Sequence, residues 1–264
     1  MNRLELTGLT KNFGGITACR DISLTIPDGQ IMGLIGPNGA GKTTIFNLIT
    51  GVYQPTGGRI YYDGQVLSRL RPDQIVDRGV ARTFQNIRLF RNLSVLDNVC
   101  IGADRHESYS LAAALVRLPY VVKKEVAIVE RAMEYLAVVG LNDKAAIRAD
   151  ALPYGLQRKL ELARALALKP KLLLLDEPAA GMNPEESMEL AGLIRRVHGQ
   201  YGLTILLIEH HMDVVMDLCE KVFVLNFGIK LAEGTAEEIQ TNPDVLKAYL
   251  GEGYRRAGNK QDQC

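Results

Sequence analysis

Short apolar runs rich in Ile, Val and Leu alternate along the chain with longer segments of helical pattern. Runs of strand length without polar alternation are typical of strands buried on both faces, as in the sheets of α/β proteins. They predict strands at Leu4–Leu9, Ile22–Ile26, Ile31–Ile35, Arg59–Tyr62, Val80–Thr83, Leu172–Leu175, Thr204–Ile208, Val222–Leu225 and Ile229–Glu233.

The first strands are separated by polar breaks that contain glycine. Pro27-Asp28-Gly29 and Tyr62-Asp63-Gly64 have the residue types of hairpin turns. We therefore expect these strands to form an antiparallel portion beside a parallel core.

Between about Ser94 and Leu168 strand signals vanish and helical patterns dominate. One helix is expected between Pro119 and Gly140, with an apolar stripe that we interpret as core packing. The stripe consists of Val122, Val126, Val129, Met133 and Leu136. The predicted organisation is a single domain over residues 1–251, whose core of residues 1–93 and 169–251 is interrupted by a helical subdomain of about 94–168. Residues 252–264 lack apolar periodicity and are predicted to form a flexible tail.

Composition narrows the class of protein. The 264 residues suffice for a well-buried core, and 31 basic against 30 acidic residues give no electrostatic reason to expect nucleic acid as the main partner. The four cysteines form no C-x-x-C pair, so we expect reduced thiols rather than a disulfide framework or zinc site. We find no signal peptide pattern and no run approaching the ~20 apolar residues of a membrane span. If the protein works at a membrane, other chains must cross it.

A complete phosphate-loop pattern, G-x-x-x-x-G-K-[ST], follows the strand Ile31–Ile35 directly and opens an apolar helix. Glycines let the backbone curl so that several N–H groups converge, and the helix N-terminus adds partial positive charge for the phosphates of ATP. Lys42 is expected to reach the phosphate oxygens, Thr43 to bind Mg²⁺ and Thr44 to donate toward the α-phosphate. The predicted nucleotide-binding residues are Gly36, Pro37, Asn38, Gly39, Ala40, Gly41, Lys42, Thr43 and Thr44.

A second candidate site lies where the apolar run Leu172–Leu175 ends in Asp176-Glu177. Alone, an acidic pair before Pro178 would be read as a helix cap. Beside a phosphate loop, Asp176 is predicted to hold Mg²⁺ and Glu177 to orient or deprotonate the attacking water.

With these motifs the sequence resembles the ATP-binding cassette family over about Leu4 to Gly251. The resemblance implies a P-loop NTPase core of mixed sheet with an antiparallel β subdomain and an inserted α-helical subdomain, the ABC ATPase fold. It also implies that Gln85 ligates Mg²⁺ and senses the transmembrane subunits, that His210 contacts the γ-phosphate, and that Phe13 stacks on adenine.

The family's Leu-Ser-Gly-Gly-Gln signature, which closes the ATP site of the partner subunit, matches Leu152 to Gln157 with departures. Pro153 replaces the serine and Leu156 the glutamine, while Tyr154, Gly155 and Gln157 remain candidates for nucleotide contact at a helix N-terminus. Asn183 stands where the family usually has aspartate. We expect the chain's own phosphate loop to be competent and the site that its signature completes to be weaker.

Several segments are similar to importers of branched-chain amino acids, above all Asn242 to Gly251 near the C-terminus. The resemblance implies an ATP-hydrolysing subunit on the cytoplasmic face of the inner membrane. Its partners would be a second ATP-binding subunit, either a copy of this chain or, as in these importers, a different one, two membrane permeases and, indirectly, an extracytoplasmic binding protein. Importers of urea and short amides share much of this pattern, as do lipopolysaccharide exporters more distantly. A soluble cassette protein of translation or DNA repair and a phosphate-loop kinase remain alternatives from other classes.

Overall fold

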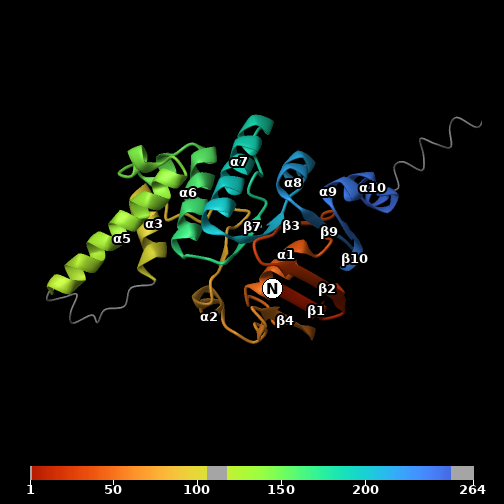
Figure 1. Cartoon of the computed structure of the whole chain (residues 1–264). Helices are drawn as coiled ribbons and strands as arrows, with labels where there is room; N and C mark the ends of the chain where they lie inside the picture. The colour runs from red at the N-terminus through yellow and green to blue at the C-terminus, as the bar shows by residue number, and fades with distance from the viewer. Residues whose placement is uncertain (1, 106–117, 251–264) are drawn as a thin grey trace, which may run out of the picture. The chain divides into compact units, whose positions relative to one another are not determined.

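The computed structural model describes residues 2–105 and 118–250, and the predicted tail of residues 252–264 lies outside them (Figure 1). The chain divides into two compact units, one of residues 1–75 with 204–264 and one of residues 76–203. The subdomain boundaries expected from the sequence, near residues 94 and 168, stay a prediction. Each predicted strand is present, several of them longer than expected.

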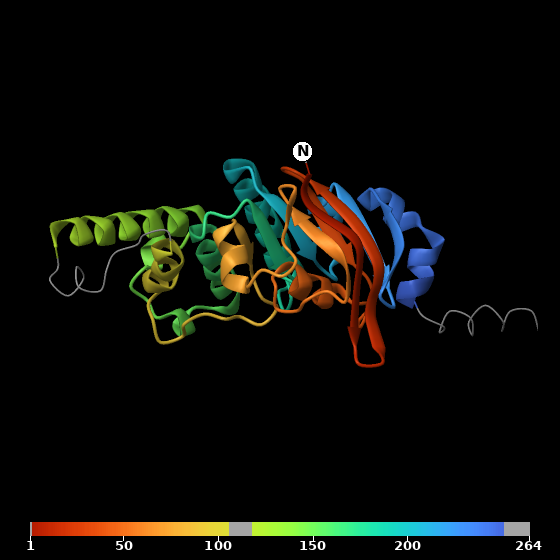
Figure 2. The same cartoon turned by 90° about the horizontal axis from the view of Figure 1, so that it is seen from below.

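The first unit contains an antiparallel sheet with the strand order β2-β1-β4-β5. Its strands are β1 (Asn2–Phe13), β2 (Ile16–Pro27), β4 (Gly57–Tyr62) and β5 (Gln65–Val66). Figure 2 shows the β1–β2 hairpin, in red, reaching past its neighbouring strands. Buried Ile22, Leu24 and Ile26 alternate with exposed residues on β2, so one face of this sheet is apolar. The predicted antiparallel portion is confirmed.

Only one of the two expected turns is a hairpin. Tyr62 pairs with Gln65, so the turn at Asp63-Gly64 joins β4 to β5 as predicted. The expectation for Pro27-Asp28-Gly29 was wrong, because this segment leads from β2 into a different sheet. Local turn chemistry does not reveal which strand the chain joins next.

The other sheet of the first unit is mostly parallel. Strand β3 (Ile31–Ile35) lies between β8 (Thr204–Ile208) and β9 (Lys221–Asn226), parallel to both, and β10 (Ile229–Gly234) pairs antiparallel with β9. All residues of β3 and β8 are buried, which explains their uninterrupted apolar sequences. The helices are α1 (Lys42–Ile49), α8 (Met212–Leu218), α9 (Ala236–Thr241) and α10 (Pro243–Leu250); α2 (Pro72–Asp77) begins in this unit.

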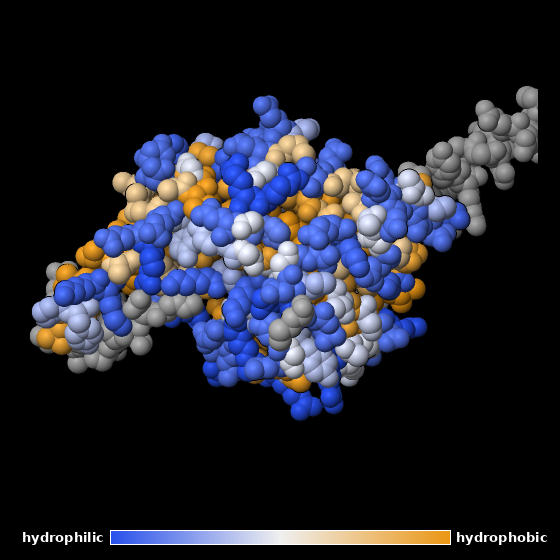
Figure 3. Space-filling model, in the orientation of Figure 1, coloured by the Kyte–Doolittle hydropathy of each residue, from blue (hydrophilic) through white to orange (hydrophobic). Residues whose placement is uncertain are grey.

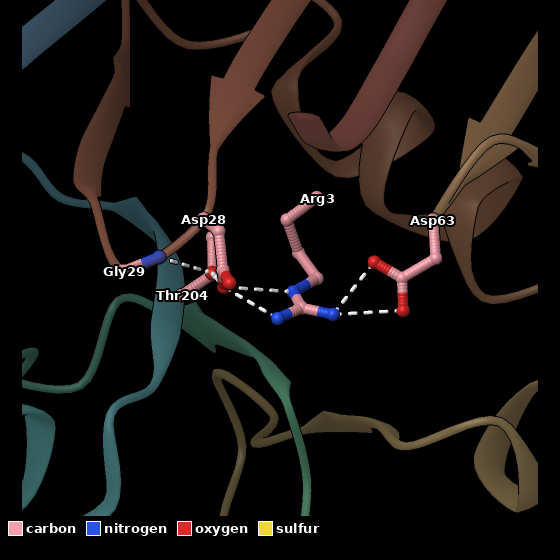
Figure 4. A network of polar contacts seen from close by, with 5 residues as sticks. All are labelled: Arg3, Asp28, Gly29, Asp63 and Thr204. Atoms are coloured by element: carbon pink, nitrogen blue, oxygen red, sulfur yellow. Dashed lines mark hydrogen bonds and ion pairs between the residues drawn. The ribbon is translucent and has the colours of Figure 1, made fainter. Parts of the chain in front are cut away.

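A polar network joins the start of β1 to both sheets of the first unit (Figure 4). The Arg3 guanidinium lies 2.5 Å from the Asp28 carboxylate and 2.6 Å from that of Asp63. Thr204, at the start of β8, accepts a bond from the Gly29 amide and donates to Asp28. Arg3 therefore links the segment between β2 and β3 to the β4–β5 turn.

Replacing Arg3 with methionine is expected to lower the free energy of unfolding by about 1–2 kcal/mol at pH 7. This value is at the low end for hydrogen bonds between charged groups, because Asp28 is half exposed and solvent weakens its pairing. The hydrogen bond from Arg3 lowers the pKa of Asp28. The stabilisation that this pair gives to the folded state is therefore present above about pH 4 and is lost as the pH falls further. Denaturant titrations at pH 7 and pH 3 measure both effects. Equal losses at the two pH values would contradict the assignment.

The second unit pairs strand β6 (Val80–Arg82) in parallel with β7 (Leu172–Asp176). Its helices are α3 (Val95–Asp104), α5 (Pro119–Val138), α6 (Tyr154–Ala167) and α7 (Pro184–Tyr201), with short 3₁₀ turns at Asn142–Lys144 and Ala149–Ala151. Helices α3, α5 and α6 pack against one another. The helical character predicted between Ser94 and Leu168 is therefore present in the described residues.

The apolar stripe predicted to pack in the core lies largely on the surface of α5. Val122, Val126 and Val129 are 42%, 51% and 42% exposed, and Figure 3 shows apolar surface, in orange, over this helix. Of the predicted stripe, Leu136 is buried as expected, and the rest of the buried face is formed by Val121, Ile128 and Ala132. Apolar residues occur all around α5, so helical spacing alone did not identify the face that packs.

Candidate functional site

The phosphate loop connects β3 to α1 in the first unit. Gly41 precedes the helix with φ 102°, and the backbone N–H groups of the first turn point to the loop side of α1. Thr43 is exposed and Thr44 half-buried, so both hydroxyls lie at the surface of this turn. Asn38 and Gly39 are exposed, Pro37 is half-buried, and Ala40 is packed inside. The helix N-terminus provides the partial positive charge that binds phosphate.

Two glycines let other strands approach the loop closely. A side chain at Gly36 would overlap the Leu225 carbonyl at the end of β9, and one at Gly41 would lie 2.6 Å from the Ala18 carbonyl of β2. Both glycines also have positive φ angles, 149° and 102°. The sequence pattern requires glycine here because the loop is held between two neighbouring backbones.

Lys42 is almost fully buried, 6% exposed, at the start of α1. Its ammonium donates to the carbonyl oxygens of Gly36, at 2.6 Å, and Pro37, at 3.0 Å. The charge is therefore held against the loop, beside the amides that would surround a phosphate.

Phe13 lies at the end of β1 and is 42% exposed. Tyr53 meets its ring edge to face with the centroids 5.1 Å apart, and the Lys11 ammonium lies 5.0 Å from the Phe13 centroid. The hairpin that ends in Phe13 also carries Ala18, which borders the phosphate loop. One hairpin thus positions both the loop and an exposed aromatic face suited to stacking on a base.

His210 follows β8 and is exposed. Its backbone amide donates to the carboxylate of Glu209, which is 1% exposed and also lies 3.2 Å from the His211 ring. Sequence reasoning did not single out Glu209, although a carboxylate at the end of an apolar strand pattern is a recognisable signal. Glu209 therefore fixes the backbone at His210, the residue predicted to contact the γ-phosphate.

The second unit brings two predicted catalytic residues into contact. The Gln85 amide donates to the Glu177 carboxylate at 2.7 Å. Glu177 has a φ of 48°, a conformation that costs a residue with a side chain about 1–3 kcal/mol and that concentrates at functional sites. The two neighbouring carboxylates have different partners, since Glu177 accepts from Gln85 and Asp176 is paired with Arg82.

Asp176, the last residue of β7, is 3% exposed and lies 2.6 Å from the guanidinium of Arg82, the last residue of β6. A buried carboxylate requires such a partner. Arg82 was missed by the sequence analysis. The available signal was an arginine that closes one buried strand while an acid closes another.

The segment that matches the signature begins α6. Tyr154 is exposed and donates its hydroxyl to the Ala180 carbonyl, 2.9 Å away, in the loop that follows Glu177. Gly155 lies against Met182 and Glu186. The Gln157 side chain donates to the Leu152 carbonyl at 2.8 Å, so it closes the turn before the helix. Within the second unit, the predicted Tyr154 and Gly155 therefore lie beside the loop after Glu177.

Asn183 has a clear local role. It caps the N-terminus of α7, accepting from the Glu186 amide at 2.9 Å while the Glu186 carboxylate accepts from the Asn183 amide. This reciprocal capping is available to asparagine as well as aspartate. The departure from the family pattern at Asn183 thus preserves the cap.

Each unit holds one part of this chemistry: the first has groups that can bind a nucleoside triphosphate, and the second has groups that can act on water. The loop amides and Lys42 suit polyphosphate, and the Gln85–Glu177 pair suits orientation of a nucleophile. Among residues 2–105 and 118–250, no helix has the length and apolarity needed to cross a bilayer.

Comparisons with known proteins find relatives over most of the chain. The profile of a family described as ABC transporter matches residues 19–180, and one described as branched-chain amino acid ATP-binding cassette transporter matches residues 230–255. The high-affinity branched-chain amino acid transport ATP-binding protein BraF of Pseudomonas aeruginosa is 45% identical, over 94% of this chain and 98% of its own length. The similarly named LivG of Escherichia coli is 44% identical over the same shares.

Solved structures extend the likeness to the fold. The ADP conformation of an ATP-binding cassette from an ABC transporter superposes with a TM-score of 0.84 at 30% identity, covering 96% of this chain and all of that one. Another, cbiO1 of Clostridium perfringens, part of an ABC transporter complex, gives 0.80 at 26% identity, with 99% of each chain covered. The expected ABC ATPase fold is confirmed. By its profile match and its relatives, the chain belongs to the ABC transporter family, among the ATP-binding subunits of its branched-chain amino acid group.

Proposed function

We propose that this chain hydrolyses ATP to drive import of branched-chain amino acids through two membrane permeases. The observation that carries the hydrolytic part is the Gln85–Glu177 hydrogen bond at the end of a buried strand. The substrate class is supported by the 45% identity to BraF and by the C-terminal profile match over residues 230–255.

The first unit would bind the nucleotide. The loop amides and Lys42 hold the β- and γ-phosphates, Thr44 donates toward the α-phosphate, and the Phe13 ring stacks on adenine. His210, fixed by Glu209, contacts the γ-phosphate. The exposure of Thr43, Phe13 and His210 supports these roles, because each can reach a ligand without repacking.

The residues proposed for Mg²⁺ are Thr43, Gln85 and Asp176. Hydroxyl, amide and carboxylate oxygens are the donors that this ion prefers, and the Gln85–Glu177 bond uses the amide nitrogen of Gln85, so that its oxygen remains a suitable ligand. When bound, the ion would neutralise charge on the phosphates. Glu177 would orient or deprotonate the attacking water.

Coupling follows from a population shift. ATP held between the phosphate loop of one subunit and the signature segment of the other adds contacts only to the closed pair, so it favours closure; hydrolysis removes them. Tyr154, Gly155 and Gln157 form the signature side. Pro153 lacks the hydroxyl and amide donor of the family's serine, so pairing with a different ATP-binding subunit would make the two sites unequal.

The assembly would lie on the cytoplasmic face of the inner membrane, where an extracytoplasmic binding protein delivers the substrate. Reconstitution of this chain with its permeases and second ATP-binding subunit in proteoliposomes tests the proposal. ATP-dependent uptake of leucine, isoleucine and valine is expected. Uptake of urea or short amides instead would contradict the substrate class while leaving the ATPase intact.

Phe90 is the best candidate for a permease contact in the second unit. Its ring is 49% exposed, while its backbone is fixed by bonds of 2.9 and 3.1 Å to the buried Asn98 side chain. Leu93 is 38% exposed and Leu89 half-buried, so both can line the same surface. Val95, in the same segment, is fully buried and therefore cannot line this surface.

Replacing Phe90 with aspartate is expected to reduce leucine uptake at least about tenfold while ATP affinity stays within twofold, since a charge at an apolar contact costs more than about 1.4 kcal/mol. Uptake and nucleotide titration measure the two quantities. Tyr120→Asp, at another exposed aromatic of this unit, is the control. Unaffected uptake by the Phe90 variant would rule out docking at this residue.

A further inference from the structure

A buried guanidinium lies behind the signature segment, on the first turns of α6. Arg158 is 4% exposed. It donates to two successive backbone carbonyls, Phe84 at 2.9 Å and Gln85 at 2.5 Å. The Gln85 carbonyl belongs to the residue whose side chain binds Glu177. Arg158 therefore holds the backbone from which a predicted catalytic side chain projects.

Glu161, one turn further along α6, completes this attachment. Its carboxylate is 3.2 Å from Arg158 and accepts from the Arg88 amide at 2.8 Å. Both side chains are almost fully buried, 3% and 2% exposed. Buried charges are tolerated only when they are paired and hydrogen-bonded, so the segment from Phe84 to Arg88 is fixed to this face of α6.

Tyr154 connects the same guanidinium to the loop after Glu177. Its hydroxyl accepts from Arg158 at 2.7 Å and donates to the Ala180 carbonyl at 2.9 Å. A Cβ at Gly181 would lie 3.4 Å from its ring, so the ring lies against this loop. Tyr154 stands where the signature of the family has its first glycine, which could make neither bond.

These contacts form a closed circuit. Arg158 bonds both the Tyr154 hydroxyl and the Gln85 backbone carbonyl. The Gln85 side chain in turn bonds Glu177. The circuit closes at Ala180, whose amide donates to the Glu177 carbonyl at 3.1 Å and whose carbonyl accepts from Tyr154. The planar guanidinium forms its bonds in a fixed fork, so its acceptors cannot shift independently. A displacement of Tyr154 must therefore be accompanied by movement at Gln85 and Glu177.

We propose that Arg158 is a positioning residue that couples the two ATP sites of the assembled transporter. The inference rests on the proposed function: the signature segment meets the ATP held by the other subunit, whereas Gln85 and Glu177 act on the ATP of this chain. Closure onto one nucleotide then sets the geometry of hydrolysis at the other. The circuit provides the contiguous physical link that such coupling between sites requires.

The test uses the complete transporter with Tyr154→Phe, which removes only a hydroxyl, and Arg158→Lys, which keeps the charge but loses the fork. We expect kcat for ATP to fall about five- to tenfold, the size of one or two lost hydrogen bonds, with KM within twofold. The Hill coefficient for ATP should fall from a value between one and two toward one. In the double variant, the fold reduction in kcat should be smaller than the product of the two single reductions. Lys159→Met, which removes the neighbouring Lys159–Glu189 surface pair, should change none of these values.

A purely structural role would give a different result. Variants with a lower melting temperature but wild-type kcat and Hill coefficient would overturn the inference, as would multiplicative losses in the double variant. Equal rates of ATP hydrolysis by the wild-type transporter and the Tyr154→Phe variant would also overturn the inference. Absence of ATPase activity in the wild-type transporter would instead overturn the proposed function, and with it this inference.

Discussion

Lys42→Met is expected to weaken ATP binding at least about 100-fold, because the loss of bonds from an ammonium to phosphate oxygens costs more than about 2.7 kcal/mol. Methionine has a similar length and fills the same buried space, so the loop should keep its shape. The Lys42 ammonium already bonds the Gly36 and Pro37 carbonyls, which places its charge at the phosphate-binding amides. Calorimetric titration of the purified chain with ATP and Mg²⁺ measures the loss.

The matched control for this prediction is Lys230→Met in the same unit. Lys230 is paired with Glu233 on β10 at 2.6 Å and is 45% exposed, so its removal should leave ATP affinity unchanged. A melting curve for each variant separates loss of binding from loss of fold. Undiminished affinity of the Lys42 variant would contradict the assignment of the phosphate loop, and the proposal of ATP-driven transport with it.

The phosphate loop was predictable because its chemistry is contiguous in sequence. Strand, glycines, lysine and helix start follow one another over residues 31–49, and the local backbone alone defines the anion site. The strands were predictable for a related reason. Burial on both faces leaves uninterrupted apolar runs, as at Ile31–Ile35 and Thr204–Ile208.

The partners of the charged residues that hold the second unit's site together were not predictable. Arg82 and Asp176 are 94 positions apart, and Glu161 bonds the amide of Arg88 across 73 positions. Charged residues are seldom fully buried without partners. From the sequence alone, Arg158 and Glu161 would therefore be placed on the solvent-exposed face of a helix. Only the fold shows that their partners are backbone groups near Gln85.

The prediction that the apolar stripe of α5 packs in the core failed for a different physical reason. Helical spacing reports that apolar residues share a face, but packing decides which face is covered. Val121 is 1% exposed and the adjacent Val122 is 42% exposed, although the two residues are chemically identical. Sequence therefore located the helix without identifying its packed side.

Glu177→Gln is expected to lower ATP turnover of the assembled transporter about 10²- to 10⁴-fold, the usual contribution of a general base, while ATP binding persists. Glutamine has nearly the same shape, and its carbonyl oxygen can still accept the bond of 2.7 Å that Gln85 donates. The backbone at φ 48° is stressed equally by either side chain, so stability should change little. The loss would then report removal of a proton acceptor rather than of a structural contact.

Phosphate release and ATP binding, measured on the same preparation, separate the two steps. Glu185→Gln is the control, because Glu185 is exposed in the first turn of α7 and is not the carboxylate that caps this helix. Its turnover should match the wild type. Near-normal phosphate release by the Glu177 variant would reject its role as the base, whereas lost binding would mean that the charge of Glu177 is needed to assemble the nucleotide site. Retained ATP binding with lost turnover is the result expected if Glu177 acts on the attacking water. The Glu177→Gln substitution would then hold the transporter in its ATP-bound, closed form.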